Sequence, residues 1–285
     1  MPEVPDLIYI EAELARAFPG HRVVAVRAGD PVPFRIMIDG KLSEILCGKR
    51  LLTVERRGHF LRFGFDHDLV LVINAMLAGR YAITSADGEN NASDPQSLIL
   101  AMSFDNGKEL RYLDAKRMGK VYVAMTEQEH LIPYYGSLGV DVMSSAFTKE
   151  VFDSLLRGRR DQVRNFLMDK TALASIGNAY ADEILFAAGL HPKTFCYQLS
   201  KQDGLQLFEN ITPVLRHAAD HVARVGPDLQ DKVRDFLSVR GRAGKPCTKC
   251  KTTVRSVRVN SADANFCPTC QPARRALFID WNRKP

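Results

Sequence analysis

The chain has 285 residues, of which 46% are hydrophobic and 25% are charged, a composition typical of a soluble globular protein with about two domains. Six cysteines are too few for a disulfide scaffold of this length, and the first residues lack the basic and apolar regions of a signal peptide. No stretch approaches the roughly 18 consecutive apolar residues that a membrane-spanning helix needs. The sequence therefore predicts a cytoplasmic protein that does not enter a membrane.

The net charge of +6 is unevenly distributed along the chain. Residues 224–285 contain 14 basic and 5 acidic side chains, whereas residues 1–223 contain 25 basic and 28 acidic ones. A cationic segment of this kind is either a solubilising surface or a surface that binds nucleic acid or another polyanion. Charge alone leaves both interpretations open.

The predicted elements change type along the chain. Apolar residues at helical spacing predict a helix over residues 2–18, which Pro19-Gly20 ends. Short β-type segments separated by turn residues follow, a pattern typical of a sandwich or barrel. These segments are residues 23–26, 36–38, 51–54, 60–65, 69–73, 98–104 and 121–123. Helical periodicity then predicts helices over residues 147–156, 162–168, 176–188 and 199–225.

Four of the six cysteines form two Cys-x-x-Cys pairs separated by 16 residues. They are Cys247, Cys250, Cys267 and Cys270. This spacing lets four thiolates bind one tetrahedral Zn²⁺, and a site closed by four protein ligands is structural rather than catalytic. The alternative, two redox-active pairs, lacks the expected βαβ context. Cys47 and Cys196 occur singly among apolar residues and are predicted to lie in the core.

Three motifs, in this order along the chain, resemble those of one family. Residues 1–6 resemble its N-terminus, residues 173–192 resemble its helix-two-turn-helix signature, and residues 241–271 resemble its zinc finger. The chain is identified by them as a divergent member of the formamidopyrimidine-DNA glycosylase and endonuclease VIII family of base-excision repair enzymes.

The resemblance implies an α+β multi-domain fold. Residues 1–128 would form a catalytic domain made of an N-terminal helix and a β-sandwich. Residues 137–239 would form a helix-two-turn-helix DNA-binding domain. Residues 240–285 would form a four-cysteine zinc finger, built on a β-hairpin that holds one structural Zn²⁺, with a basic C-terminal tail.

The resemblance also implies the catalytic residues. After removal of Met1, Pro2 would be the nucleophile that attacks C1′ of the damaged nucleotide, and Glu3 would be the general acid and base. A terminal secondary amine suits this role, because an α-amino group has a pKa near 8 and condenses to an iminium. Asp6 occupies the place of a usual glutamate, and His59 occupies that of the family's catalytic lysine. Without the resemblance, Pro2-Glu3 also fits an ordinary helix start.

DNA contacts follow from the same resemblance. Asn178 matches the family's phosphate-binding asparagine, and Leu77 matches its intercalating residue. Residues 114–119 align with a second loop that fills the space of the extruded base; its contributors are Lys116, Arg117 and Met118. A lysine lacks the planar paired donors of arginine, so we expect weaker discrimination of the base opposite the lesion.

The zinc hairpin departs from the family pattern. Ala262 stands where the family's DNA-gripping arginine is expected, and Arg255 or Arg258 can compensate only if the hairpin directs them at DNA. The segment 226–239 is also shorter than the resemblance leads us to expect. It corresponds to the family's loop that caps 8-oxoguanine. We therefore do not expect 8-oxoguanine to be the favoured substrate.

The implied function is excision of oxidised or ring-opened bases from DNA, with possible cleavage of the abasic strand through a proline iminium. The partner would be double-stranded DNA containing a damaged base or an abasic site, and the protein would be a bacterial cytoplasmic monomer acting at the nucleoid. The alternatives are a non-catalytic paralogue that binds lesions or abasic sites, and a zinc protein unrelated to repair. Retention of Pro2-Glu3 favours the enzyme, because a binding module does not need that dipeptide.

Overall fold

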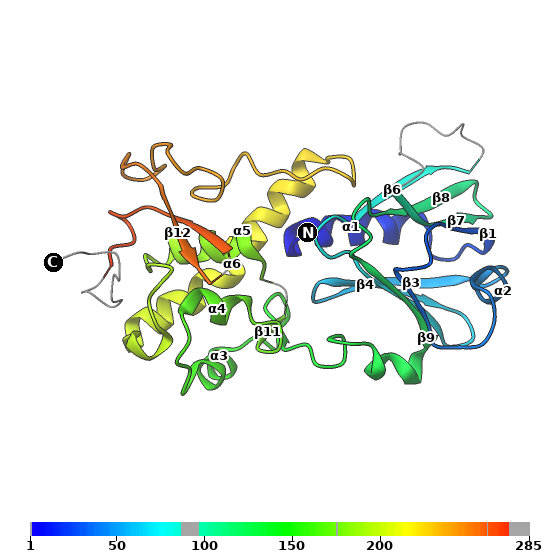
Figure 1. The fold of residues 1–285 in the computed structure, drawn as a ribbon, viewed down its shortest axis with the longest axis horizontal. Helices are drawn as coiled ribbons and strands as arrows, with labels where there is room; N and C mark the ends of the chain where they lie inside the picture. The colour runs from blue at the N-terminus through cyan, green and yellow to red at the C-terminus, as the bar shows by residue number, and fades with distance from the viewer. Residues whose placement is uncertain (1, 87–96, 175, 261, 274–285) are drawn as a thin grey trace. The chain divides into compact units, whose positions relative to one another are not determined.

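The computed structural model describes residues 2–86, 97–174, 176–260 and 262–273. It divides the chain into two compact units, Met1–Ser137 with Ala219–Val233 and Leu138–Ala218 with Arg234–Pro285 (Figure 1). Met1 and most of the expected basic tail, residues 274–285, lie outside the described residues. Within the described parts of the chain, no helix is both long and apolar enough to cross a bilayer.

The first unit contains helix α1, Val4–Ala17, and two β-sheets. The four-stranded sheet has the order β1-β7-β8-β6, and the five-stranded sheet has the order β2-β9-β5-β4-β3. The strands are β1 Val23–Ala28, β2 Phe34–Ile36, β3 Leu51–Arg57, β4 Phe60–Phe65, β5 Leu69–Asn74, β6 Arg80–Ser85, β7 Leu98–Phe104, β8 Lys108–Leu113 and β9 Lys120–Met125. A short helix α2, Leu42–Leu46, precedes β3, and a 3₁₀ turn, Thr126–Leu131, follows β9. The predicted sandwich is confirmed.

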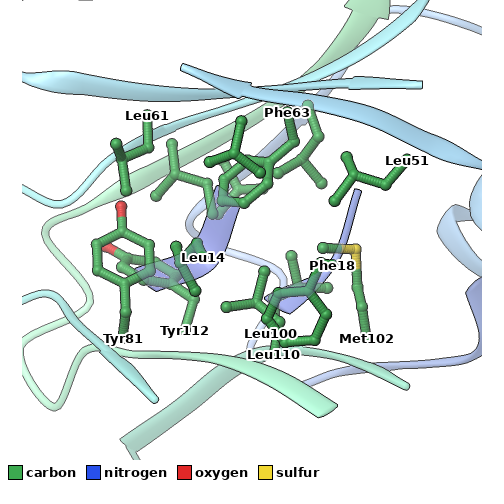
Figure 2. Packing of buried hydrophobic residues seen from close by; sticks show 14 of the residues in the cluster. Leu14, Phe18, Leu51, Leu61, Phe63, Tyr81, Leu100, Met102, Leu110 and Tyr112 are labelled. Carbon is green, nitrogen blue, oxygen red and sulfur yellow. The ribbon is translucent and has the colours of Figure 1, made fainter. Parts of the chain in front are cut away.

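The core of this unit lies between the two sheets. Successive side chains of a strand alternate between its faces, so every second residue of β4 points inward, including Leu61 and Phe63. Figure 2 shows these two side chains facing Tyr81 and Tyr112 of the other sheet, with Leu14 of α1 between them. Helix α1 therefore contributes its apolar face to the same core that joins the sheets.

The sequence pattern did not predict β6 and β8. Strand β8 contains two charged side chains that are buried, Glu109 and Arg111, and these interrupt its apolar pattern. They form an ion pair with a 2.6 Å N···O distance, and Arg27 approaches Glu109 to 2.9 Å. Buried charges are tolerated when they are paired, and this pairing is visible only in the folded sheet.

One of the two single cysteines was wrongly predicted to lie in the core. Cys47 follows the end of α2 and is exposed, because the five-residue helix buries only its two leucines. Cys196 is buried as predicted, and burial raises the pKa of its thiol to about 12. Neither thiol is near the four-cysteine cluster along the chain.

The second unit is mainly helical and ends in a β-hairpin. Its helices are α3 Lys149–Leu156, α4 Val163–Met168 and α5 Asn178–Ala187, and α6 Lys201–Val225 runs from this unit into the first. Its strands are β10 Val140–Asp141, β11 Leu173–Ala174, β12 Arg255–Val259 and β13 Ala262–Phe266, and Cys196–Gln198 is a 3₁₀ turn. All four predicted helices are present. Buried aromatic side chains from three of them, including Phe152 and Phe166, form the core.

Candidate active site and nucleic-acid interface

The N-terminal turn of α1 is fixed by a carboxylate. Pro2 and Glu3 are buried, and Glu3 precedes the first helical residue. The backbone N–H of Glu3 donates a 2.8 Å hydrogen bond to Oδ2 of the buried Asp6. The first turn of a helix has backbone N–H groups without helical partners, and Pro5 has no N–H to satisfy. Asp6 therefore holds the backbone beside the predicted nucleophile and acid.

His59 lies in the tight turn between β3 and β4. Arg57 pairs with Phe60, so the turn consists of Gly58 and His59 alone, and Gly58 has the positive φ of 60° that glycine adopts readily. The imidazole is half-buried, and its ring centroid lies 4.4 Å from that of Phe60. The hairpin thus holds His59 against an aromatic ring at its tip.

The hairpin tip lies level with the start of α1. Strand β3 begins beside the C-terminus of α1, where the Gly20 N–H donates a 2.8 Å hydrogen bond to the Leu51 carbonyl. Further along the strand, the Arg56 N–H donates a 2.7 Å hydrogen bond to the carboxylate of Glu11 in the middle of α1. A strand advances about 3.3 Å per residue and a helix about 1.5 Å. The chain turns after Arg57, so His59 lies about two strand steps beyond Arg56, which equals roughly four helical residues and brings His59 level with the first turn of α1.

Two loops lie at the same end of the five-stranded sheet. Phe60 pairs with Asn74, and Asn74 pairs with Lys120, so the His59 turn, the loop after β5 and the loop before β9 are neighbours. The last two loops begin and end close together, since a Cβ placed on Gly119 would lie 3.0 Å from the carbonyl oxygen of Asn74 at the end of β5. Strand register therefore brings together three segments that are far apart in the sequence.

Each loop exposes an apolar side chain at its tip. Leu77 is 53% exposed and Met118 is 38% exposed. The second loop is held by the buried Asp114, whose carboxylate accepts hydrogen bonds from the N–H groups of Lys116 at 3.0 Å and Gly119 at 2.7 Å. Exposed apolar side chains on rigid neighbouring loops can enter a gap in a base stack.

The two basic residues of the second loop differ in their surroundings. Lys116 is exposed. Arg117, which has a positive φ of 53°, forms an ion pair with Asp30 at 3.0 Å. Its side chain is about half exposed, so this pair is weak in water, and the guanidinium can exchange it for a phosphate.

The start of α5 carries the predicted phosphate ligand. Gly177 precedes the helix and Asn178 begins it, as expected. The Nη2 group of Arg164 donates a 2.9 Å hydrogen bond to Oδ1 of the half-exposed Asn178. No sequence motif predicts a role for Arg164, which is 1% exposed and belongs to α4.

Two further carboxylates missed from the sequence connect α5 to the zinc hairpin. Asp182 accepts hydrogen bonds from the side chains of Arg164 at 2.8 Å and Arg240 at 2.9 Å. Glu183 accepts from three successive backbone N–H groups, those of Ser238, Val239 and Arg240. Burial raises the pKa of Glu183 against the opposing effect of these bonds. Two adjacent acids inside an otherwise apolar helix were the signal that could have identified them.

The four predicted metal ligands converge. Their sulfur atoms all lie within 4.8 Å of one another, with 3.4 Å between those of Cys250 and Cys267 and 3.9 Å between those of Cys247 and Cys270. Four sulfurs at Zn–S distances of about 2.3 Å would be about 3.8 Å apart in a tetrahedron. The cluster therefore fits one structural Zn²⁺, which would join the loop after Pro246 to the end of β13.

Arg255 and Arg258 project from opposite faces of the hairpin. They are three residues apart on one strand, and side chains at odd separations point to opposite sides. Arg255 lies across from Phe266, whereas Arg258 lies across from Asp263. Both are exposed, but they cannot face a single DNA surface together.

Zinc removal should unfold the hairpin. We expect about one zinc per chain in the purified protein and its loss in Cys267→Ser, with a lower Tm, because a four-thiolate site folds only around its metal. Metal analysis by mass spectrometry and thermal unfolding measure both effects. Cys47→Ser is the matched control, and a zinc content equally reduced in that variant would contradict the assignment.

His191 should make the fold acid-sensitive. Its ring packs edge-on against Phe266 at 4.6 Å, and burial, aided by the Lys193 cation, lowers the pKa of His191 to about 4. The unfolded chain has the ordinary histidine pKa near 6.5, so it binds the proton first as pH falls. The wild type should lose about 2 to 3 kcal/mol of stability between pH 6.5 and 4 through this residue. Thermal unfolding should show a smaller pH dependence in His191→Gln, and identical pH dependence would refute the assignment.

Comparisons with known proteins agree with this architecture. Residues 1–121 match the formamidopyrimidine-DNA glycosylase N-terminal domain, residues 138–225 match the formamidopyrimidine-DNA glycosylase H2TH domain, and residues 244–273 match the zinc finger found in FPG and IleRS. The formamidopyrimidine-DNA glycosylases of Laribacter hongkongensis and Exiguobacterium sibiricum are 31% and 30% identical to the chain. Each match covers 95% of the chain, with 100% and 99% of the respective relative.

Solved structures give the same result. Wild-type Lactococcus lactis Fpg (MutM), in a complex with DNA containing N7-benzyl-Fapy-dG, is 25% identical with a TM-score of 0.83. The Lactococcus lactis protein bound non-covalently to DNA containing an AP site is 25% identical with a TM-score of 0.82. Both matches cover 95% of the chain and 100% of the solved chain. The chain belongs to the formamidopyrimidine-DNA glycosylase family.

Proposed function

We propose that the chain is a DNA glycosylase that excises oxidised or ring-opened bases and cleaves the resulting abasic strand. The observation that carries the proposal is the convergence, at one end of the five-stranded sheet, of the His59 turn with two loops that expose Leu77 and Met118. A terminal amine beside a carboxylate suits attack on a sugar carbon. Exposed apolar side chains suit the space left by an extruded base.

Pro2 is the proposed nucleophile once Met1 has been removed. Its secondary amine forms a bond to C1′ and the glycosidic bond breaks, so the base leaves with the bonding electron pair and takes up the proton that the amine nitrogen loses. Glu3 protonates the ring oxygen as the C1′–O4′ bond opens, which gives an iminium. Glu3 then accepts a proton from C2′, and elimination breaks the C3′–O bond. Water releases the enzyme from the iminium.

Asp6 is proposed to be a positioning residue in this scheme. Its carboxylate accepts the hydrogen bond from the Glu3 backbone, so it fixes the peptide between the nucleophile and the acid rather than contacting the sugar. This role suits a side chain that is one methylene shorter than the glutamate expected from the family.

DNA binding is proposed to divide between phosphate contacts and a wedge. Leu77 and Met118 would fill the vacated stack. Lys116 and Arg117 lie beside Met118 in the same loop, where they would contact the opposite strand. Asn178, at the start of α5, would bind a backbone phosphate. The solved Lactococcus lactis complexes, which hold DNA with an abasic site or a Fapy lesion, support this substrate class.

The chain is proposed to be a divergent family member in two places. His59 would replace a lysine as a donor to the phosphate beside the lesion, since the hairpin holds it level with the first turn of α1. Ala262, at the start of β13, would leave the zinc hairpin without its usual phosphate-binding arginine. We further propose that the protein acts as a monomer in a bacterial cytoplasm, where its substrate DNA lies. Its proposed functional domains are residues 1–128, 137–239 and 240–285.

Pro2 can be tested by reductive trapping. Incubation of the protein with abasic-site DNA and borohydride should give a covalent adduct, because borohydride reduces the iminium to a stable amine. Pro2→Gly, or an N-terminal extension, should abolish the proline adduct, and peptide mass spectrometry of the adduct should locate the crosslink at Pro2.

The protein used for trapping must have a free Pro2, which intact-mass measurement establishes. If such protein yields no adduct but still prefers abasic-site DNA over intact DNA, the enzymatic mechanism is wrong and a lesion-binding paralogue is favoured. Glu3→Gln is the companion variant. It retains the amine and should slow strand cleavage at least a hundredfold by removing the acid and base.

His59 can be tested through the pH profile of base excision. A histidine loses its proton between pH 5 and 8, whereas a lysine keeps its charge. His59→Gln should lower single-turnover excision about tenfold to a hundredfold, the value of a charge-assisted hydrogen bond. His59→Lys should retain activity at higher pH than the wild type does. If His59→Lys leaves both the rate and its pH profile unchanged, the role is wrong.

A further inference from the structure

One buried carboxylate in the second unit accepts hydrogen bonds from two arginine side chains and from a backbone N–H of a strand. Asp182 is 0% exposed, and its Oδ1 accepts from Nε of Arg164 at 2.8 Å. Its Oδ2 accepts from Nη1 of Arg240 at 2.9 Å and from the backbone N–H of Asn265 at 3.0 Å. The carboxylate therefore joins α4, α5, residue 240 and β13. Two cations share one anion, so the network carries a positive charge that the carboxylate does not neutralise.

Arg164 fixes the orientation of the Asn178 side-chain amide. An arginine side chain can only donate hydrogen bonds, so the amide atom that lies 2.9 Å from Arg164 Nη2 must be the carbonyl oxygen. The NH₂ group of Asn178 consequently points away from Arg164. It has no hydrogen-bond acceptor among the described residues.

Arg240 presents a pair of donors beside this amide. Only Nη1 of Arg240 has partners in the described parts of the chain, namely Asp182 and the carbonyl oxygen of Asp263 at 2.7 Å. The same carbonyl lies 3.4 Å from Nη2 of Arg164, so a short run of hydrogen bonds connects Arg240 to Asn178. The side chain of Arg240 is 31% exposed. Its Nε and Nη2 form the parallel fork that binds two oxygens of one phosphate.

An alternative cation on the hairpin is Arg258. It lies directly across the strand pair from Asp263 and on the same face, so a carboxylate of opposite charge is its cross-strand neighbour. Asp182, by contrast, is shared, because its two oxygens accept hydrogen bonds from the guanidinium groups of Arg164 and Arg240, so Arg240 does not have a carboxylate to itself.

We propose that Arg240 and the amide nitrogen of Asn178 bind the same stretch of DNA backbone phosphate, with Arg164 as a positioning residue and Asp182 as their shared anchor. The inference rests on the proposed DNA glycosylase function and assigns a backbone contact to Arg240. Arg240 belongs to the segment between α6 and the zinc hairpin. Its Nη1 donates a hydrogen bond to the carbonyl oxygen of Asp263, the residue next to Ala262. It thereby provides a cation at the hairpin edge where the strand itself has alanine.

Salt-dependent binding tests the role of Arg240. Binding of the full-length protein to a duplex with a tetrahydrofuran abasic-site analogue would be followed by fluorescence anisotropy over a series of KCl concentrations. Each phosphate contact adds about 0.9 to the slope of log K against log salt concentration. Arg240→Gln should reduce the slope by about 0.9. It should weaken binding to the abasic-site duplex and to an intact duplex by similar factors, because a phosphate contact does not depend on the lesion.

Arg258→Gln is the matched control, because it removes the same charge from the same hairpin region. Its slope should stay close to that of the wild type. The inference is overturned if Arg240→Gln leaves the slope unchanged, or if only Arg258→Gln reduces it. Arg240→Lys keeps the charge but loses the fork, so it should retain most of the slope with weaker affinity.

A double-mutant cycle tests the positioning role of Arg164. Arg164→Lys should weaken DNA binding about tenfold in the wild-type background, the value of a hydrogen bond to a charged group, while changing the salt slope little. In an Asn178→Ala background the same change should have almost no effect, because there is no amide left to orient. Equal losses of affinity in both backgrounds would show a merely structural role and overturn this part.

The inference and the proposed function fail in different ways. If the wild type gives no borohydride adduct but Arg240→Gln still reduces the salt slope, the phosphate contact stands and the glycosylase proposal falls. If the adduct forms normally and Arg240→Gln binds with the wild-type slope, only the contact assigned to Arg240 falls. Thermal unfolding of each variant confirms that binding is compared among folded proteins.

Discussion

The pairing of Phe60 with Asn74, and of Asn74 with Lys120, decides where the catalytic unit can act. Because strands β4, β5 and β9 end in register, the His59 turn and the two loops with exposed apolar tips meet at one end of the sheet. A shift of one residue would turn every side chain of a strand to the other face, so the buried core residues of β4 and β5 fix this register. The core therefore maintains the site without contributing a chemical group to it.

The second unit depends on a carboxylate in the same way. A buried charge is costly unless it is paired and hydrogen-bonded, and Asp182 satisfies both conditions through Arg164, Arg240 and a backbone N–H of β13. One backbone N–H of β13 is thereby satisfied, and the hairpin is tied to the helix that begins with Asn178. Zinc closes the far end of the same hairpin. Metal binding and the buried ion network are two separate constraints on one small element.

Features whose chemistry is local were predictable from the sequence, whereas features whose burial depends on a distant partner were not. The cysteine spacing, the helix start at Gly177-Asn178 and the apolar periodicity of α1, β4 and β7 each depend on residues close together in the chain. Two buried or exposed positions of the second kind were mispredicted. Strand β8 was missed because its buried Glu109 is matched by Arg27 and Arg111, and Cys47 was misplaced because apolar neighbours in sequence do not guarantee burial.

The sequence by itself determined the order of the elements, the four zinc ligands and, by resemblance, the residues expected to carry the chemistry. Only the tertiary structure decided how those residues are held: Asp6 on the Glu3 backbone, His59 at a tip level with α1, and Arg255 and Arg258 on opposite faces of the hairpin. Arg164 and Arg240 entered the site only there, because they are 76 residues apart in the sequence and meet through one carboxylate. Hydrogen-bond partners are selected by distance in space, and a linear pattern does not encode that distance.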